Sequence, residues 1–274
     1  MTDQIASPAS VRAKYDSAMF RMLAEVWENH FHMGWFETSD ETLGTAGARA
    51  TAMMAEACAP APNSVVLEVA CGTGATARAL AERFGARVIA TNLSTSQIEQ
   101  GRAALADAPS RDRICFAVAD YHTLPFAGGA FDVWWCQEAL LYATDRDRVF
   151  AEARRVVRPG GRLVVSDLLV TASIGKSALD ELARTITAPG FWTAERYEDF
   201  FVSKGFEVLA RRDGAPHVAA TFSCVLDRLR ARSEAFAARL GNAEPVIAAE
   251  RRLELQLRRA REGQLGWFWW VLKR

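Results

Sequence analysis

The sequence predicts an α/β protein with a doubly wound, mostly parallel sheet. Short apolar runs alternate with segments whose apolar residues recur at helical spacing, and the connections between them are short. A glycine-rich turn over residues 71–74 joins the first of these runs to the first helical segment. A length of 274 residues, 50% of them hydrophobic, suits one large domain of this kind or two small ones.

The N-terminal part of the chain has a different character from the part that follows. Residues 11–58 are mostly helical in pattern and are interrupted by an aromatic stretch over residues 30–36. A linker over residues 59–63 contains two prolines, which end the helical part because proline cannot continue a helix. We therefore expect a helical cap over residues 1–58.

The alternation of strands and helices begins after this linker. The core over residues 63–170 is expected to contain strands at 65–70, 87–91, 114–119, 131–136 and 162–166, and helices at 73–84, 94–106 and 145–157. Gly85 is a plausible stop for the first helix. Residues 171–274 are expected to supply the substrate-lid helices and the last two strands of the same domain, with a helix at 194–204 and strands at 206–211 and 267–273.

Composition and charge exclude several classes of protein. The 33 basic side chains balance 33 acidic ones, so the clustered positive charge of a nucleic-acid-binding protein is missing. No apolar run approaches the roughly 20 residues of a membrane span, and no apolar segment near the N-terminus indicates a signal peptide. Five scattered cysteines favour reduced thiols. We expect a cytoplasmic protein without a membrane or nucleic-acid partner.

The glycine-rich turn by itself fits two kinds of cofactor. Gly72, Gly74 and Ala77 match the dinucleotide pattern G-x-G-x-x-G/A. However, Glu68 places a carboxylate close to where a pyrophosphate would need unopposed N–H groups. A carboxylate there suits the ammonium and sulfonium of S-adenosylmethionine, and a purely structural role for the turn also stays open.

Later segments resemble class I S-adenosylmethionine-dependent methyltransferases. Residues 68–74 resemble their first motif, with Ala70 where many members have glycine, and residues 88–94 resemble the end of their second strand. Residues 119–126, 131–135 and 155–161 complete the core pattern at the expected spacings. The resemblance implies a Rossmann-like seven-stranded fold and S-adenosylmethionine as cofactor. It also implies that the cofactor contacts Tyr15, Glu68, Ala70, Gly72, Gly74, Asn92, Leu93, Gln97, Asp120, Tyr121 and Gln137.

Asn92 departs from the family pattern, because an Asp or Glu there commonly binds the ribose hydroxyls. An amide can still hydrogen-bond a diol, although without charge. A nucleic-acid methyltransferase is disfavoured by the neutral charge and by residues 136–138, which stand where amino-methylating nucleic-acid enzymes carry an Asn/Asp-Pro-Pro-aromatic motif. A nicotinamide-dependent oxidoreductase is disfavoured by Glu68 and by the cap.

Three segments resemble glycine/sarcosine/dimethylglycine N-methyltransferases, namely residues 92–94, 136–146 and 265–267. Sugar O-methyltransferases and tocopherol-type methyltransferases share much of this layout. Tyr142 stands where these relatives usually carry His, and tyrosine is a poor base near neutrality. The sequence therefore favours transfer of a methyl group to an amine nitrogen of a small molecule. The alternatives are O- or C-methylation of an aromatic, sugar or terpenoid acceptor, and a catalytically silent cofactor-binding protein.

The acceptor side of the site is assigned partly from this resemblance and partly from the positions of the residues along the chain. Tyr142, His32 and Asp167 are the expected catalytic residues, although His32 could be a structural hydrogen-bonding residue and Asp167 a helix or turn cap. The expected acceptor pocket contains aromatic rings that could equally belong to the core, from Trp35, Trp135, Trp192 and His217. We expect no metal, because no His, Cys or carboxylate cluster has ligand spacing. A monomer or homodimer is expected.

Overall fold

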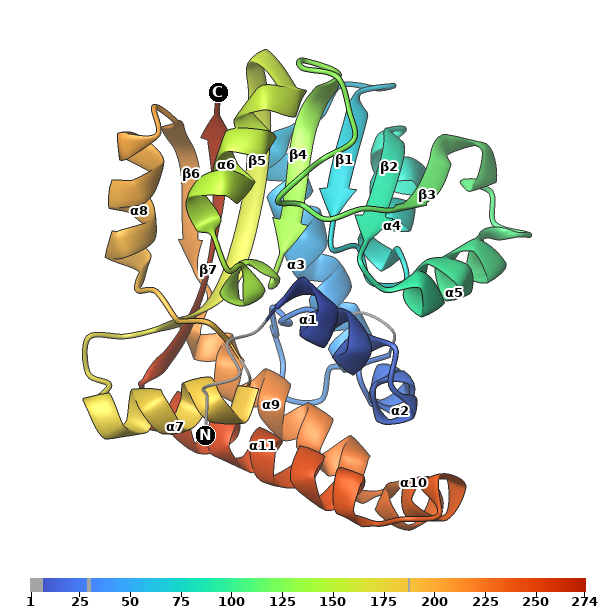
Figure 1. Ribbon diagram of the computed structural model, residues 1–274, viewed down its shortest axis with the longest axis vertical. Coiled ribbons are helices and arrows are strands. Elements are labelled where there is room, and N and C mark those ends of the chain that lie inside the picture. Colours follow the sequence, from blue (N-terminus) through green and yellow to red (C-terminus); the bar gives the residue numbers. More distant parts are fainter. Residues whose placement is uncertain (1–6, 29–30, 187) are drawn as a thin grey trace.

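The computed structural model describes residues 7–28, 31–186 and 188–274, and its centre is a seven-stranded sheet (Figure 1). The strand order is β3-β2-β1-β4-β5-β7-β6, with β7 antiparallel to both of its neighbours and the first five strands parallel. This topology confirms the predicted doubly wound sheet. The strands are β1 (Val65–Val69), β2 (Arg87–Asn92), β3 (Ile114–Val118), β4 (Phe131–Gln137), β5 (Val157–Val170), β6 (Glu207–Asp213) and β7 (Leu265–Lys273).

Helices cover both faces of the sheet. One apolar cluster joins the sheet to α3 (Leu43–Cys58), α4 (Ala75–Phe84) and α5 (Thr95–Leu105). A second cluster on the opposite face joins it to α6 (Arg146–Val156) and α8 (Ala194–Ser203). Because both faces are covered, the central strands β1 and β4 are buried along nearly their whole length, whereas the edge strand β6 is largely exposed.

Caps define the ends of the core helices. Gly85 ends α4 in the left-handed conformation at a φ of 67°, which confirms it as the predicted stop. The Ser94 side chain accepts a hydrogen bond from the Gln97 N–H at 3.1 Å and so begins α5. Asp145 caps α6 in the same way through the Arg148 N–H.

Two elements differ from the sequence prediction. Strand β5 is much longer than the expected 162–166. Pairing with β7 extends it to Val170, and Val157 at its start pairs with Phe131 of β4. Helix α7 (Lys176–Ile186) occupies a segment for which no element was expected. Its buried residues Leu182 and Ile186 belong to the larger apolar cluster. Both differences come from packing against segments far away in the sequence.

The remaining helices lie at the carboxyl ends of the parallel strands. In Figure 1 the arrowheads of β1 and β4 point toward α1 (Pro8–Tyr15), and α9 (Ala215–Arg230) and α11 (Glu244–Arg261) lie beyond it. Helices α2 (Ala18–Val26) and α10 (Ser233–Leu240) complete this group. The predicted cap and lid therefore meet over one edge of the sheet. No helix in the described ranges is long and apolar enough to cross a membrane.

Candidate active site

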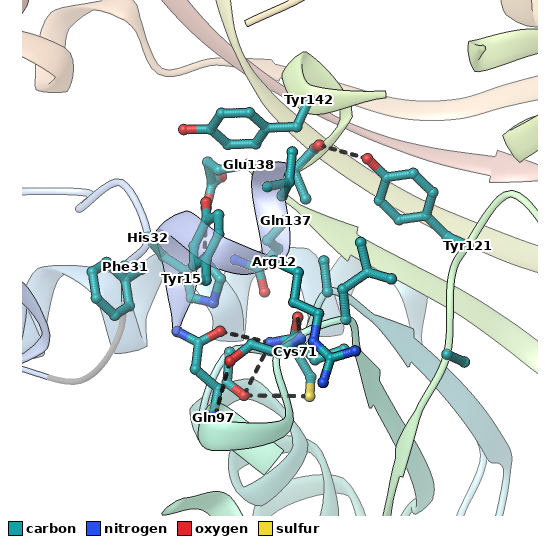
Figure 2. Close-up of a pocket in the computed structure, with 18 residues that line it drawn as sticks. Arg12, Tyr15, Phe31, His32, Cys71, Gln97, Tyr121, Gln137, Glu138 and Tyr142 are labelled. Carbon is teal, nitrogen blue, oxygen red and sulfur yellow. Dashed lines mark hydrogen bonds and ion pairs between the residues drawn. The ribbon is translucent and has the colours of Figure 1, made fainter. Parts of the chain in front are cut away.

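A pocket of about 740 Å³ lies at the carboxyl ends of β1, β2 and β4 (Figure 2). Ligands of open α/β sheets bind at this edge. The cap contributes one wall through α1 and through the segment that follows α2. The lining residues are Val11, Arg12, Tyr15, Phe31, His32, Ala70, Cys71, Gly72, Asn92, Leu93, Ser94, Gln97, Ala119, Tyr121, Gln137, Glu138, Ala139 and Tyr142.

The glycine-rich turn forms the floor of this pocket. Ala70, Gly72 and Gly74 all have positive φ, at 53°, 56° and 77°. Gly74 begins α4, and a Cβ placed there would lie 2.4 Å from Cζ of Phe116 on β3. Glycine is therefore required at position 74 by close packing, whereas Gly72 faces the pocket itself.

Glu68 lies at the end of β1 and is buried, with 2% of its surface exposed. It is not among the residues that line the pocket. Its Oε2 atom has no hydrogen-bond partner among the described residues. Burial raises the pKa of Glu68 to about 8, although the Arg78 guanidinium acts in the opposite direction. A cation above this carboxylate would favour its ionised form.

The end of β2 contributes an amide pair. Asn92 Nδ2 donates to Gln97 Oε1 at 2.7 Å, and Asn92, Leu93 and Gln97 all line the pocket. Ser94 Oγ donates to Asp16 Oδ1 at 2.5 Å, which ties the cap to this strand end. The structure thus brings together the three residues that the sequence assigned to this wall.

The side-chain amide of Gln137, at the end of β4, has hydrogen-bond partners at its oxygen atom but none among the described residues at its nitrogen atom. Its Oε1 atom accepts hydrogen bonds from Thr76 Oγ1 at 3.0 Å and Trp135 Nε1 at 2.7 Å. Its buried Nε2 atom has no partner among the described residues. Since Gln137 lines the pocket, this amide offers two donors to a ligand.

The end of β3 places Tyr121 in the pocket wall, where its hydroxyl donates to the Ala139 carbonyl at 3.3 Å. Asp120 does not line the pocket, because its Oδ1 atom accepts from the His122 N–H at 2.8 Å and contacts His122 Nδ1 at 2.7 Å. Burial acts to raise the pKa of Asp120, but the hydrogen bonds with His122 outweigh it and lower the pKa.

A second cavity of about 730 Å³ adjoins the first and lies between the cap and the lid. Tyr15, Phe31, Glu138 and Tyr142 line both cavities and so mark the junction between them. Figure 2 shows Tyr15, Glu138 and Tyr142 gathered at one side of the first pocket, away from Gln97 and Cys71. The second cavity has mainly apolar walls, formed by Phe20, Leu23, Trp27, Phe31, Met33, Leu141, Leu168, Ile186, Phe222 and Leu253.

Glu138 is the carboxylate at this junction, and sequence reasoning did not assign it a role. Its Oε2 atom lies 2.7 Å from His32 Nδ1, and its Oε1 atom accepts from Ser166 Oγ at 2.5 Å and Trp267 Nε1 at 2.8 Å. Its φ of 47° is rare for a residue with a side chain. A polar residue directly after a buried strand was the signal that could have identified it.

Tyr142 holds its hydroxyl 3.2 Å from Nζ of Lys14, which α1 supplies. Burial acts to raise the pKa of Tyr142, but the Lys14 ammonium, with smaller effects of Arg252 and Tyr15, lowers the pKa below its ordinary value. Lys14 was also missed by sequence reasoning. Its partner lies 128 positions away, so no local pattern could reveal the pair.

His32 lines the first pocket, and its Nε2 atom lies 3.2 Å from Thr76 Oγ1. Apart from His32 and Tyr142, the expected acceptor-side residues lie outside both cavities. Asp167 is buried in β5 and accepts a hydrogen bond from the Tyr197 hydroxyl at 2.7 Å. The four expected pocket rings pack elsewhere: Trp35 against His217 at 4.3 Å, Trp192 against Tyr197 at 4.9 Å, and Trp135 within the core.

Comparison with known proteins identifies the family. The profile of the family described as "Methyltransferase domain" matches residues 67–165. The O-methyltransferase resE of Aspergillus sclerotiorum is 30% identical over 208 residues, which are 75% of this chain and 78% of that protein. The chain belongs to the S-adenosylmethionine-dependent methyltransferases.

Further relatives of this methyltransferase carry different names. The methyltransferase GfsG of Streptomyces halstedii is 35% identical over 65% of this chain, which spans 63% of that relative, slightly less than two thirds of its length. The sarcosine/dimethylglycine N-methyltransferase of Halorhodospira halochloris is 28% identical over 69% of each chain. Among solved structures, the mycolic acid cyclopropane synthase CmaA1 complexed with SAH and CTAB has a TM-score of 0.88 at 17% identity, with both chains fully covered.

The first pocket of the methyltransferase fits the cofactor of this family. The vacant Gln137 amide can donate to a carboxylate, and the unpartnered Glu68 oxygen suits a nearby ammonium. The backbone at Gly72 leaves room for close approach of a ligand. No group of three or more His, Cys, Asp or Glu with metal-binding geometry occurs in the part of the chain that is described, from which His30 is excluded.

Proposed function

We propose that this methyltransferase transfers a methyl group from S-adenosylmethionine to a hydroxyl oxygen of a largely apolar small molecule. The observation that carries the proposal is the Tyr142 hydroxyl, placed at the junction of the two cavities and 3.2 Å from the Lys14 ammonium. A phenol next to an ammonium is a better proton acceptor near neutrality than an isolated phenol. Tyr142 therefore supplies the base that an acceptor hydroxyl needs.

The charges around the second cavity also favour oxygen. The cationic side chains that line it are Lys14 and Arg252, and the described carboxylate there, Glu138, is already engaged by His32. An alkoxide or phenolate nucleophile is stabilised by these cations, whereas an ammonium product would be repelled by them. The apolar lining suits a hydrophobic acceptor better than a small amino acid.

The proposal assigns distinct roles to the residues at the junction. When bound, S-adenosylmethionine supplies an electrophilic methyl group on a positively charged sulfur. Tyr142 removes the proton from the acceptor hydroxyl, and Lys14 stabilises the tyrosinate that does so. Glu138 provides a negative charge near the junction, held in place by His32, Ser166 and Trp267. The cap and the lid exclude water and align the reactants.

Transfer to an amine nitrogen is the second candidate. It is supported by the resemblance of residues 136–146 to glycine-type N-methyltransferases and by N-methyltransferases among the relatives. The rings of Tyr15, Phe31 and Tyr142 at the junction could also hold a cationic product by cation–π contact.

We place either reaction in the cytoplasm, because all five cysteines are free thiols.

The experiment that tests the proposal compares matched acceptors. The purified protein is incubated with S-adenosylmethionine carrying a deuterated methyl group and with pairs of phenols and anilines, or alcohols and amines, that share one carbon skeleton. We expect the label on oxygen and little or none on the paired amine. Product isolation and NMR locate the methyl group, and a label found consistently on nitrogen would overturn the hydroxyl proposal in favour of the second candidate.

A further inference from the structure

The second cavity contains two polar side chains without partners on one face of a lid helix. Arg252 and Gln256 lie four residues apart on α11, so both face the same direction, and both line the cavity. Neither side chain makes a hydrogen bond or ion pair with another described residue. Gln256 has 9% of its surface exposed, so most of its side chain is buried in the cavity wall.

Unpaired polar groups next to apolar walls are costly unless a ligand completes them. Two other arginines of α11, Arg258 and Arg259, both form ion pairs with Glu181. Glu138 is the carboxylate that the described cavity wall contains, and its oxygen atoms are engaged by His32, Ser166 and Trp267. Arg252 is partly exposed, and its guanidinium is available to pair with a ligand in the cavity.

The position of Arg252 suits the far end of an acceptor molecule. It lines the second cavity and also the groove between α7 and α11 on the surface, so it stands at the boundary between the two. Its charge acts on the Tyr15 and Tyr142 hydroxyls, which places it within electrostatic reach of the junction. A ligand held by Arg252 would extend from the lid toward Tyr142.

We propose that Arg252 and Gln256 bind an oxyanion, a carboxylate or phosphate, carried by the otherwise apolar acceptor. The guanidinium presents two parallel donors that match such a group, and the Gln256 amide adds a further donor. The acceptor class is thus a hydrophobic acid with a methylatable group at the opposite end. This inference rests on the proposed function, because it identifies the second cavity as the acceptor site.

Lys14 does not replace Arg252 in this role. Its ammonium donates to the Tyr142 hydroxyl and to the Ile186 carbonyl, each at 3.2 Å, so two of its three donors are engaged. The two cations therefore have different roles: Lys14 lies beside the reacting end of the acceptor, and Arg252 binds the anionic group at its other end.

The test measures binding, so that it does not depend on the position of the transferred methyl group. Calorimetry on the protein saturated with S-adenosylhomocysteine compares benzoic, cinnamic, 2-naphthoic and decanoic acids with their amides, and 2-naphthyl phosphate with 2-naphthol. We expect the anionic member of at least one pair to bind and its neutral partner to bind at least tenfold more weakly. Equal or better binding of the neutral members, or no binding of any anionic member, would overturn the inference.

Variants of the lid helix α11 then test whether Arg252 and Gln256 cause the preference for anionic probes. Arg252→Gln should weaken binding of the anionic probe about 10- to 150-fold, the value of a charge-assisted hydrogen bond, and leave the neutral probe unaffected. Gln256→Leu should weaken it less. Arg251→Gln is the matched control, since Arg251 is exposed and lines the outer groove but not the cavity. An unchanged preference in Arg252→Gln would contradict the assignment.

The outcomes separate this inference from the proposed function. Failure to bind S-adenosylhomocysteine would count against the first pocket as the cofactor site and not against the anchor. Anionic probes that bind through Arg252, together with methyl transfer to nitrogen, would keep the anchor and remove the hydroxyl proposal. Methyl transfer to oxygen on neutral acceptors alone would keep the hydroxyl proposal and remove the anchor.

Discussion

Substitution of Tyr142 by Phe separates the two candidate reactions by magnitude. The change removes one oxygen atom and keeps the ring that lines both cavities. If Tyr142 is the base for a hydroxyl, kcat should fall 10²- to 10⁴-fold, which corresponds to about 2.7–5.4 kcal/mol in the activation barrier. If the acceptor is an amine that needs only alignment, the loss should be about 0.5–1.5 kcal/mol, the value of one hydrogen bond.

Lys14 supplies the matched test of how Tyr142 is activated. The ammonium lies 3.2 Å from the phenol oxygen and lowers its pKa against the effect of burial. Lys14→Gln removes that charge, so the pKa of Tyr142 should rise and the rising limb of the pH–rate profile should move to higher pH. Activity should then be low near pH 7 and recover in more basic solution, whereas Lys14→Arg should keep the original profile.

The assay is steady-state turnover at saturating S-adenosylmethionine between pH 6 and pH 10, with product quantified by mass spectrometry. Affinity for S-adenosylhomocysteine, measured by calorimetry, controls for damage to the pocket. A loss below tenfold in Tyr142→Phe, or a pH profile that Lys14→Gln leaves in place, would refute the assignment of Tyr142 as base.

Three further predictions concern the cofactor side. Glu68 has a pKa of about 8 in the folded protein and of 4.5 when unfolded, so the folded state holds its proton to higher pH. The free energy of unfolding of the ligand-free protein should therefore fall as the pH rises from 4.5 to about 8. Urea titrations should show a weaker fall in Glu68→Gln. In Gly74→Ala, the new Cβ would lie 2.4 Å from Phe116 on a backbone with a φ of 77°, so the same titrations should show a loss of about 2–4 kcal/mol in the free energy of unfolding. In Gly72→Ala, no atom lies within 4 Å of the new Cβ, so the loss should be about 1 kcal/mol. Equal losses would contradict the packing argument. Glu138→Gln removes a negative charge at the junction. It should weaken binding of S-adenosylmethionine severalfold more than binding of S-adenosylhomocysteine, whose sulfur is uncharged. Equal losses of affinity for the two ligands in calorimetry would exclude an interaction of Glu138 with the sulfonium.

The core of the fold could be predicted because its signals are local. Each buried parallel strand is a short apolar run, and each helix begins or ends at a residue with a recognisable cap, such as Ser94 or Gly85. The long β5 and helix α7 could not be predicted in the same way. Their lengths depend on β7 and on the apolar cluster they join, and these contacts form only in three dimensions.

The cofactor pocket and the acceptor cavity differ in how far sequence reasoning could reach. Asn92 and Gln137 end their strands and the turn residues follow β1 directly, so their position at the carboxyl edge was predictable. The acceptor cavity is built from the cap and the lid, where tryptophan carries no positional signal. Trp27 lines this cavity, whereas Trp35 packs on Trp267 at 6.3 Å and stays outside it.

The way in which α1 is held connects the cap to the proposed chemistry. This helix has no buried residue. Arg12 donates to Thr95 at 3.0 Å, Lys14 donates to Tyr142 and Ile186, and the Tyr15 ring contacts Phe20 and Tyr142. A segment with few buried apolar contacts opens at a lower free-energy cost than the core does. The same helix forms a wall of the cofactor pocket and carries the ammonium beside Tyr142. The proposed activation of Tyr142 by Lys14 therefore depends on the position of the same helix that walls the cofactor pocket.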